Sequence, residues 1–142
     1  MTDLDNNRID LLYSKAKEAR TNAYAPYSKF NVGAAVLTSD GEIFTGANVE
    51  NASYGLTICA ERAAIFSAVN SGASRIDALL LVADTEPGKI VPCGACLQVM
   101  SEFMDDVAQV ICCTLDSGRE YLELRDLLPR AFRMDKEAED DR

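Results

Sequence analysis

The chain has 142 residues, 48% of them apolar, which is enough for one domain with a sizeable core. Asp and Glu outnumber Lys and Arg by 23 to 14, so the formal net charge is −9. Such a surface repels phosphate groups and argues against nucleic acid and anionic membranes as partners. No run of residues is long enough to span a membrane, and residues 1–10 do not resemble a signal peptide. We therefore expect a soluble, cytoplasmic protein.

The first half of the chain predicts a helix, a hairpin and a second helix. Apolar residues recur at helical spacing over residues 6–20, and Asp5 or Asn6 is available as the cap. Two short apolar runs flank the turn residues Ser-Asp-Gly at 39–41, as in a β-hairpin. Residues 58–71 are rich in helix formers and are followed by a glycine stop signal.

The second half alternates strands with helices. The continuous apolar run at 76–84 is typical of a strand covered on both faces, and residues 94–104 have helical character. Another buried strand is predicted at 107–115. Because only a short turn follows it, the strand at 119–124 should pair antiparallel with it. A short helix is expected around residues 125–132.

This order of elements predicts an α/β fold. Five strands, two of them joined as a hairpin and others separated by helices, form a mixed sheet with helices on its faces, a three-layer α/β/α sandwich. We expect one domain over residues 1–133. The remaining residues, 134–142, are highly charged and lack a core face, so we expect an acidic, disordered tail.

Three cysteines stand where loops lead into predicted helices. Cys59 precedes one helix, and Cys93 and Cys96 begin another. Free N–H groups and aligned peptide dipoles at a helix N-terminus favour the thiolate, which is the form that binds metal. Three protein ligands around zinc leave the fourth tetrahedral position for water, as in catalytic sites. The spacing therefore predicts a catalytic zinc centre in a chain that has no histidine.

A fourth ligand would change this interpretation. Cys112 and Cys113 are candidates, and either would close the site into a structural zinc or interaction module. Both lie in a predicted apolar strand, where cysteine commonly packs as a small hydrophobic residue. We favour the packing role.

Glu61 and Arg62 lie two and three residues after Cys59 along the chain. Since residues two apart on a helix point to different faces, Cys59 must stand at the helix start if Glu61 is to face the same metal. A carboxylate there can take and return a proton without being a ligand. Arg62 is close enough to donate N–H groups to the sulfurs and offset their negative charge. The simpler alternative is an exposed Glu-Arg pair of little energetic value.

Four segments, PYSKFNVGAAV, NVENASYGLTICAERAA, PCGACLQV and LLPRAF, together resemble the cytidine deaminases in order and spacing. The resemblance covers nearly the whole chain and is to the short-chain class that assembles as homotetramers. It implies zinc-dependent hydrolytic deamination of cytidine and deoxycytidine to uridine and deoxyuridine, with release of ammonia, in pyrimidine salvage. It also implies one Zn²⁺ per subunit and a small pyrimidine nucleoside as the binding partner.

By position, the resemblance assigns the catalytic centre residue by residue. Cys59, Cys93 and Cys96 match the zinc ligands of the family, and Glu61 matches the residue that shuttles protons between water, the cytosine ring and the leaving amine. Arg62 remains the cation beside the thiolates. The chain departs from the family at Leu97, where arginine is common, which leaves Arg62 as the main neighbouring cation.

The same resemblance assigns the substrate contacts. Asn48 and Glu50 match residues that bind the ribose hydroxyls, and Phe30 matches an aromatic contact to the base. Ala60 would offer its backbone to the amide edge of the base. Two further aromatic residues are expected near subunit interfaces: Phe132 reaching in from a neighbouring subunit, and Tyr54 in the loop beside the active site.

Three alternatives stay open at this point. One is the structural zinc module, and the second is thiol-disulfide exchange through the Cys-Gly-Ala-Cys motif, which leaves Glu61 without a role. The third keeps the same metal chemistry but takes a nucleoside-like antibiotic or analogue as substrate. Deamination of a polynucleotide is disfavoured because it needs a basic groove and this chain is acidic.

Overall fold

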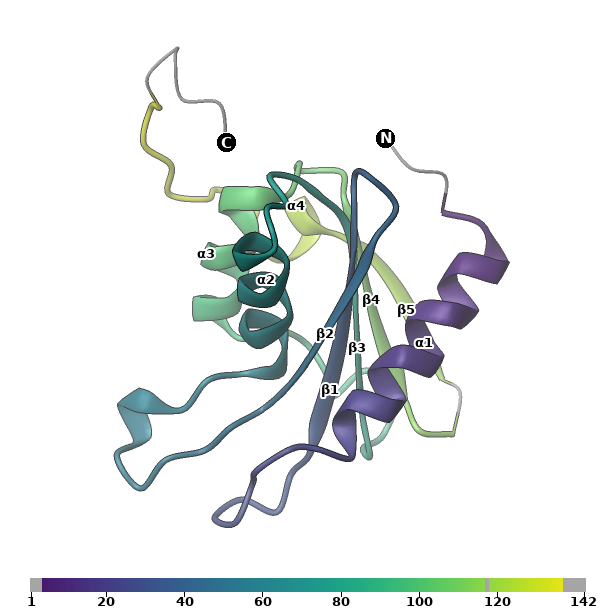
Figure 1. Cartoon of the computed structure of the whole chain (residues 1–142), viewed down its shortest axis with the longest axis vertical. Coiled ribbons are helices and arrows are strands. Elements are labelled where there is room, and N and C mark those ends of the chain that lie inside the picture. Colours follow the sequence, from purple (N-terminus) through teal and green to yellow (C-terminus); the bar gives the residue numbers. More distant parts are fainter. Residues whose placement is uncertain (1–3, 117, 137–142) are drawn as a thin grey trace.

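A mixed five-stranded sheet with helices on both faces forms the centre of the computed structural model, which describes residues 4–116 and 118–136 (Figure 1). The strand order is β2-β1-β3-β4-β5. The elements are α1 (Asn6–Arg20), β1 (Val32–Thr38), β2 (Ile43–Ala47), the 3₁₀ turn η1 (Tyr54–Leu56), α2 (Ala60–Asn70), β3 (Ile76–Ala83), α3 (Gly94–Phe103), β4 (Gln109–Thr114), β5 (Arg119–Glu123) and α4 (Leu124–Leu127).

The pairing of the strands explains the layers. β1 pairs antiparallel with both β2 and β3, β3 pairs parallel with β4, and β4 pairs antiparallel with β5. The parallel pair requires a crossover, and α3 provides it. Helix α1 covers one face of the sheet, and α2 and α3 lie together on the other (Figure 1). The predicted three-layer α/β/α sandwich with a mixed sheet is confirmed.

The core consists of one apolar layer on each side of the sheet. Along β3, Leu79 and Leu81 face the layer beneath α2 and α3, while Leu80 and Val82 face the layer beneath α1. All four are fully buried, as expected for a continuous apolar strand covered on both faces. Since both layers are filled, the sheet is a rigid platform for the loops at its edges.

Two features of the structure correct the sequence prediction. The C-terminal helix is only four residues long, Leu124–Leu127, rather than extending over residues 125–132. Pro129 is the physical reason, because it disfavours the helical region for the preceding residue, and Leu128 has φ −136° and ψ 72°. The 3₁₀ turn η1 was not predicted at all.

The predicted acidic tail is described only in part. Residues 134–136 have no regular secondary structure, and Lys136 Nζ lies 3.6 Å from a carboxylate oxygen of Glu102 on α3. Residues 137–142 lie outside the described residues, so the division of the chain after residue 133 stays a prediction. Among the helices of the described part, none combines the length and apolar character needed to cross a membrane.

Candidate active site

The starts of α2 and α3 bring three cysteines together. Cys59 is the N-cap of α2, Cys93 is the N-cap of α3, and Cys96 lies in the first turn of α3. The Sγ atoms of Cys59 and Cys93 are 3.9 Å apart, and those of Cys93 and Cys96 are 3.5 Å apart. Placing the cysteines at helix starts, as the sequence predicted, also gives each thiolate the favourable end of a helix dipole.

This sulfur geometry fits a tetrahedral zinc ion. A Zn–S bond of about 2.3 Å implies sulfurs roughly 3.8 Å apart at tetrahedral angles. The three sulfurs lie within 4.8 Å of one another, and within the described ranges no other His, Cys, Asp or Glu joins the group. Cys112 and Cys113 are buried in β4, one in each core layer. The protein therefore supplies three ligands and leaves a position for a non-protein one.

The charge at the cluster is stabilised from two sides. A hydrogen bond with Cys96, together with Arg62, lowers the pKa of Cys59 to about 5. The same interaction and burial raise the pKa of Cys96. Arg62 donates from Nη2 to Cys59 Sγ over 3.5 Å, and its buried Nε has no hydrogen-bond partner among the described residues.

Glu61 is a buried carboxylic acid at the start of α2. It is the second residue of the helix, and its exposed fraction is only 4%. Burial raises the pKa of Glu61 to about 7, a shift that Arg62 opposes in part. A carboxyl group with a pKa near neutrality can both accept and release a proton under working conditions. With Cys59 outside the regular helix, Glu61 faces the cavity described next.

A cavity of about 240 Å³ opens in front of the cysteines and Glu61. Its lining includes four of the five predicted substrate contacts, Phe30, Asn48, Glu50 and Ala60, together with the predicted catalytic residue Glu61 and two predicted zinc ligands, Cys59 and Cys93. Five lining residues were missed by the sequence analysis: Ser28, Val32, Thr57, Ile90 and Val91. Ser28, Glu50 and Thr57 also line an adjoining hollow of about 360 Å³ that includes Tyr54.

Asn48 holds the backbone on one side of this cavity. It follows β2 directly and its side chain is 8% exposed. Its Oδ1 accepts from Val32 N over 2.9 Å, and its Nδ2 donates to Phe30 O over 2.8 Å. One N–H of the amide is left for another partner. Asn48 thus fixes the end of the loop that carries Phe30 and the first residue of β1, a structural task that the sequence analysis did not predict.

Glu50 is held by the loop that precedes β1. The backbone N–H groups of Tyr27 and Ser28 donate to Glu50 Oε1 over 3.0 and 3.1 Å, and the Ser28 hydroxyl donates to Oε2. The Ser28 hydroxyl is the main cause that lowers the pKa of Glu50. The carboxylate therefore stays charged and has a fixed orientation at the cavity wall.

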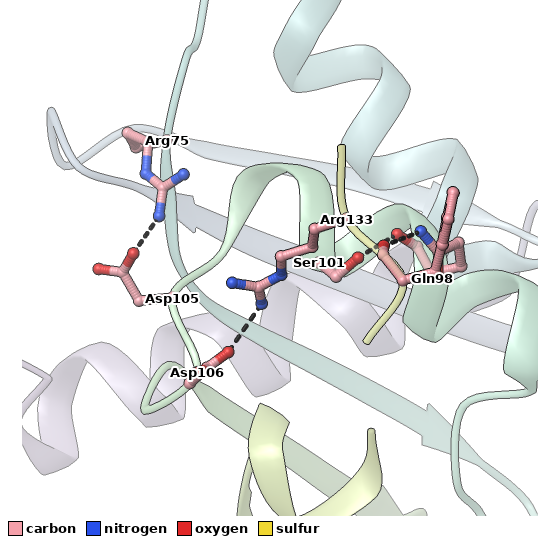
Figure 2. Close-up of polar contacts among 7 residues, drawn as sticks. Arg75, Gln98, Ser101, Asp105, Asp106 and Arg133 are labelled. Atoms are coloured by element: carbon pink, nitrogen blue, oxygen red, sulfur yellow. Dashed lines mark hydrogen bonds and ion pairs between the residues drawn. The ribbon is translucent and has the colours of Figure 1, made fainter. Parts of the chain in front are cut away.

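The two aromatic residues assigned to interfaces lie outside the cavity. Phe132 is 70% exposed, and its carbonyl oxygen accepts from Gln98 Nε2 over 2.9 Å; Figure 2 shows Gln98 beside this C-terminal segment. Tyr54 begins η1 and is 81% exposed. Neither Phe132 nor Tyr54 contributes its side chain to the cavity of its own chain.

Leu97, the position where the chain departs from the family, is buried and packs in the core layer beneath α3.

Comparison with known proteins agrees with this site. The family model described as "Cytidine and deoxycytidylate deaminase zinc-binding region" matches residues 6–114. A cytidine deaminase of Sporosarcina psychrophila is 48% identical over 87% of this chain and 90% of its own length. One of Halalkalibacterium halodurans is 47% identical over 86% of this chain and 92% of its own.

The fold leads to the same family. A crystal structure of cytidine deaminase from Burkholderia pseudomallei superposes with a TM-score of 0.83 and is 45% identical, covering 91% of this chain and all of that one. The family's zinc-binding region includes the three-cysteine cluster of this chain, whose geometry accepts the metal. The chain belongs to the cytidine deaminase family.

Proposed function

We propose that this chain catalyses the hydrolytic deamination of cytidine and deoxycytidine to uridine and deoxyuridine, with release of ammonia. Its family membership supports the reaction. The observation that carries the proposal is the position of Glu61: a buried carboxyl group with a pKa of about 7 that lines the same cavity as Cys59 and Cys93. Such a group is suited to proton transfer beside a Lewis-acidic metal.

In this mechanism Cys59, Cys93 and Cys96 hold zinc, whose chemistry when bound is to acidify water at neutral pH. Glu61 takes a proton from the attacking water and delivers it to N3 of the cytosine ring. The remaining hydroxide adds to C4 of the ring, and Glu61 then moves the proton of this new hydroxyl to the amine, so that the C4–N bond breaks, ammonia leaves and the C4 carbonyl of uridine forms. Arg62 offsets the negative charge of the thiolates, which would otherwise weaken the effect of the metal on water.

The rest of the cavity orients the nucleoside. Phe30 packs against the base and the backbone of Ala60 bonds its amide edge, while Asn48 and Glu50 bind the ribose hydroxyls. The position of all four in the lining supports these roles. A fixed carboxylate at Glu50 accepts from a free hydroxyl but repels a phosphodiester, which favours a nucleoside over a polynucleotide.

We further infer a homotetramer that acts in pyrimidine salvage in the cytoplasm. The exposed side chains of Phe132 and Tyr54 support the assembly, because aromatic residues are enriched at subunit interfaces. In the tetramer Phe132 of one subunit would complete the cavity of another. The five free cysteines support a reducing compartment, which keeps zinc-binding thiols available.

Deamination of a nucleoside-like antibiotic or analogue is the second candidate. It would use Cys59, Cys93, Cys96 and Glu61 in the same way and differ only in the groups that meet Glu50. The oriented carboxylate at Glu50 favours a substrate with sugar hydroxyls.

Absorbance of the cytosine ring and ammonia release provide the test. We expect the zinc-loaded protein to convert cytidine and deoxycytidine, to lose activity on chelation and to regain it with Zn²⁺. Free cytosine, which lacks the sugar, should react much more slowly because Asn48 and Glu50 have nothing to bind. Rapid conversion of an analogue with no turnover of cytidine would contradict the proposed substrate.

A further inference from the structure

The loop before β1 is folded around the carboxylate of Glu50. Ser28 makes two of the three hydrogen bonds to this group, one through its backbone N–H and one through its hydroxyl. The hydroxyl oxygen also accepts from the backbone N–H of Phe30 over 3.0 Å. A single side chain thus connects the carboxylate assigned to the ribose with the backbone of the aromatic residue assigned to the base.

The hydrogen bonds determine how much of the carboxylate is free. A carboxylate has two acceptor positions on each oxygen. Oε1 accepts from two backbone N–H groups, and Oε2 accepts from the Ser28 hydroxyl. One position on Oε2 is therefore left, and the Ser28 hydroxyl fixes the direction in which it points. Glu50 lines the cavity, so this position is available to a hydroxyl of the substrate.

The backbone of the loop shows that this arrangement is specific. Lys29, between Ser28 and Phe30, has φ +62°, in the left-handed region that costs energy for a residue with a side chain. Lys29 N donates to Ala25 O over 3.0 Å, which closes the turn. The surrounding hydrogen bonds stabilise this conformation. Two of them involve the Ser28 hydroxyl, which donates to Glu50 Oε2 and accepts from Phe30 N.

We propose that Ser28 is a positioning and specificity residue: its hydroxyl orients Glu50 so that one carboxylate position reads one sugar hydroxyl of the nucleoside. Ser28 acts through Glu50 and does not itself react. This inference rests on the proposed function for its substrate class. Ser28 lies in the segment PYSKF, which carries part of the family resemblance. Its role becomes visible only in the folded loop, where its hydroxyl meets Glu50.

Steady-state kinetics with two substrates tests the proposal. Ser28→Ala should raise KM for cytidine about tenfold with little change in kcat, as expected when one hydrogen bond to a charged group is lost. For 2′,3′-dideoxycytidine, which has no secondary hydroxyl for Glu50, kcat/KM should change less than about twofold. Ser28→Thr, which keeps the hydroxyl, should restore most of the affinity for cytidine.

Two controls separate positioning from folding. Ser53→Ala removes another exposed hydroxyl near the site, one that makes no capping hydrogen bond, and should leave both substrates unchanged. Zinc content and thermal midpoint should be the same in Ser28→Ala and wild type. An unchanged KM for cytidine in Ser28→Ala would overturn the proposal. An equal fall in kcat/KM for cytidine and 2′,3′-dideoxycytidine would also overturn it.

A second readout does not depend on turnover. NMR titration of the Glu50 carboxyl group should show a higher pKa in Ser28→Ala than in wild type, since the Ser28 hydroxyl is the main cause of the lowering. An unchanged Glu50 titration would also contradict the proposal. If wild type fails to deaminate cytidine while the titration shifts as expected, the proposed function fails and the positioning role stands.

Discussion

Position in the fold separates the five cysteines into two chemical groups. Cys59, Cys93 and Cys96 meet at helix starts, where Arg62 donates to Cys59 Sγ and stabilises the thiolate of that residue. Cys112 and Cys113 lie within β4, where burial raises the pKa of Cys112 to about 12 and that of Cys113 to about 11. These two thiols lie away from the group of Cys59, Cys93 and Cys96, and at neutral pH they remain protonated and react poorly with electrophiles.

Alkylation at controlled pH tests this separation. In the folded protein, after chelation of zinc, iodoacetamide should label Cys59 and Cys93 but neither Cys112 nor Cys113. Raising the pH from 8 to 9.5 should not change this, because both values stay below the raised pKa values of about 12 and 11. In denaturant every cysteine should react. Labelling of Cys112 or Cys113 while circular dichroism shows a folded protein would contradict the assignment.

At the residue scale, the sequence predicted the parts of the site that depend on local spacing. Cys59, Glu61, Cys93 and Cys96 are recognisable because a helix start fixes where each points. Ser28 was not predicted, because its partner Glu50 is distant in the chain and meets it only after the loop folds.

Helix α2 lies very close to strand β2, and a glycine makes this approach possible. A Cβ atom on Gly46 would stand 2.4 Å from Ala64 N and 2.8 Å from Ala60 O. Since α2 begins next to Cys59 and carries Glu61, its distance from the sheet sets the position of the catalytic centre. Gly33 plays the same part on the other face, where a Cβ atom would stand 2.0 Å from Ala16 O of α1.

Comparison of the two glycines tests which helix matters for the metal. Gly46→Ala and Gly33→Ala should each destabilise the fold by about 1–3 kcal/mol through overpacking. Only Gly46→Ala should also weaken zinc retention, because it displaces α2. Competition with a chromogenic chelator and thermal unfolding provide the two measurements, with Gly55→Ala, which meets no atom within 4 Å, as the neutral control. Equal zinc affinity in Gly33→Ala and Gly46→Ala would contradict this account.

The elements themselves were largely predictable. Strongly periodic segments such as α1 and continuous apolar runs such as β3 were predicted with nearly their observed bounds. The C-terminal helix was overestimated because the effect of Pro129 on Leu128 was not weighed against the helix formers around it. The close packing at Gly46 depends on a tertiary contact, which a single sequence does not reveal.

On the scale of the whole molecule, the C-terminal segment, residues 132–136, is bound to α3 and to the loop that follows α3. Gln98 donates to Phe132 O, and Arg133 Nη2 lies 2.7 Å from Asp106 Oδ1 (Figure 2). These contacts hold Phe132 on the surface, at the place where we propose that it serves a neighbouring subunit. In the proposed tetramer, α3 would begin with a zinc ligand of one site and support the aromatic residue of another.

A charge swap tests the importance of the ion pair between Arg133 and Asp106. Arg133→Asp should raise KM for cytidine about two- to fivefold, in line with the small energy of an exposed ion pair. Adding Asp106→Arg should restore KM, since the pair is rebuilt with its charges reversed. Arg75→Ala breaks the neighbouring ion pair with Asp105, for which no hydrogen bond or ion pair with residues 132–136 is found in the described part of the chain, and should have no effect (Figure 2). Failure of the double variant to recover would contradict the role of the segment.

The most direct test of the account concerns Glu61. We would measure cytidine turnover and zinc content for wild type, Glu61→Ala and Glu42→Ala, the last being an exposed glutamate in the hairpin. Loss of at least about 10³-fold in kcat is expected for Glu61→Ala with zinc retained, because general acid-base groups contribute on this order. Glu42→Ala should behave as wild type. Substantial turnover by zinc-loaded Glu61→Ala would show that the proton carrier lies elsewhere.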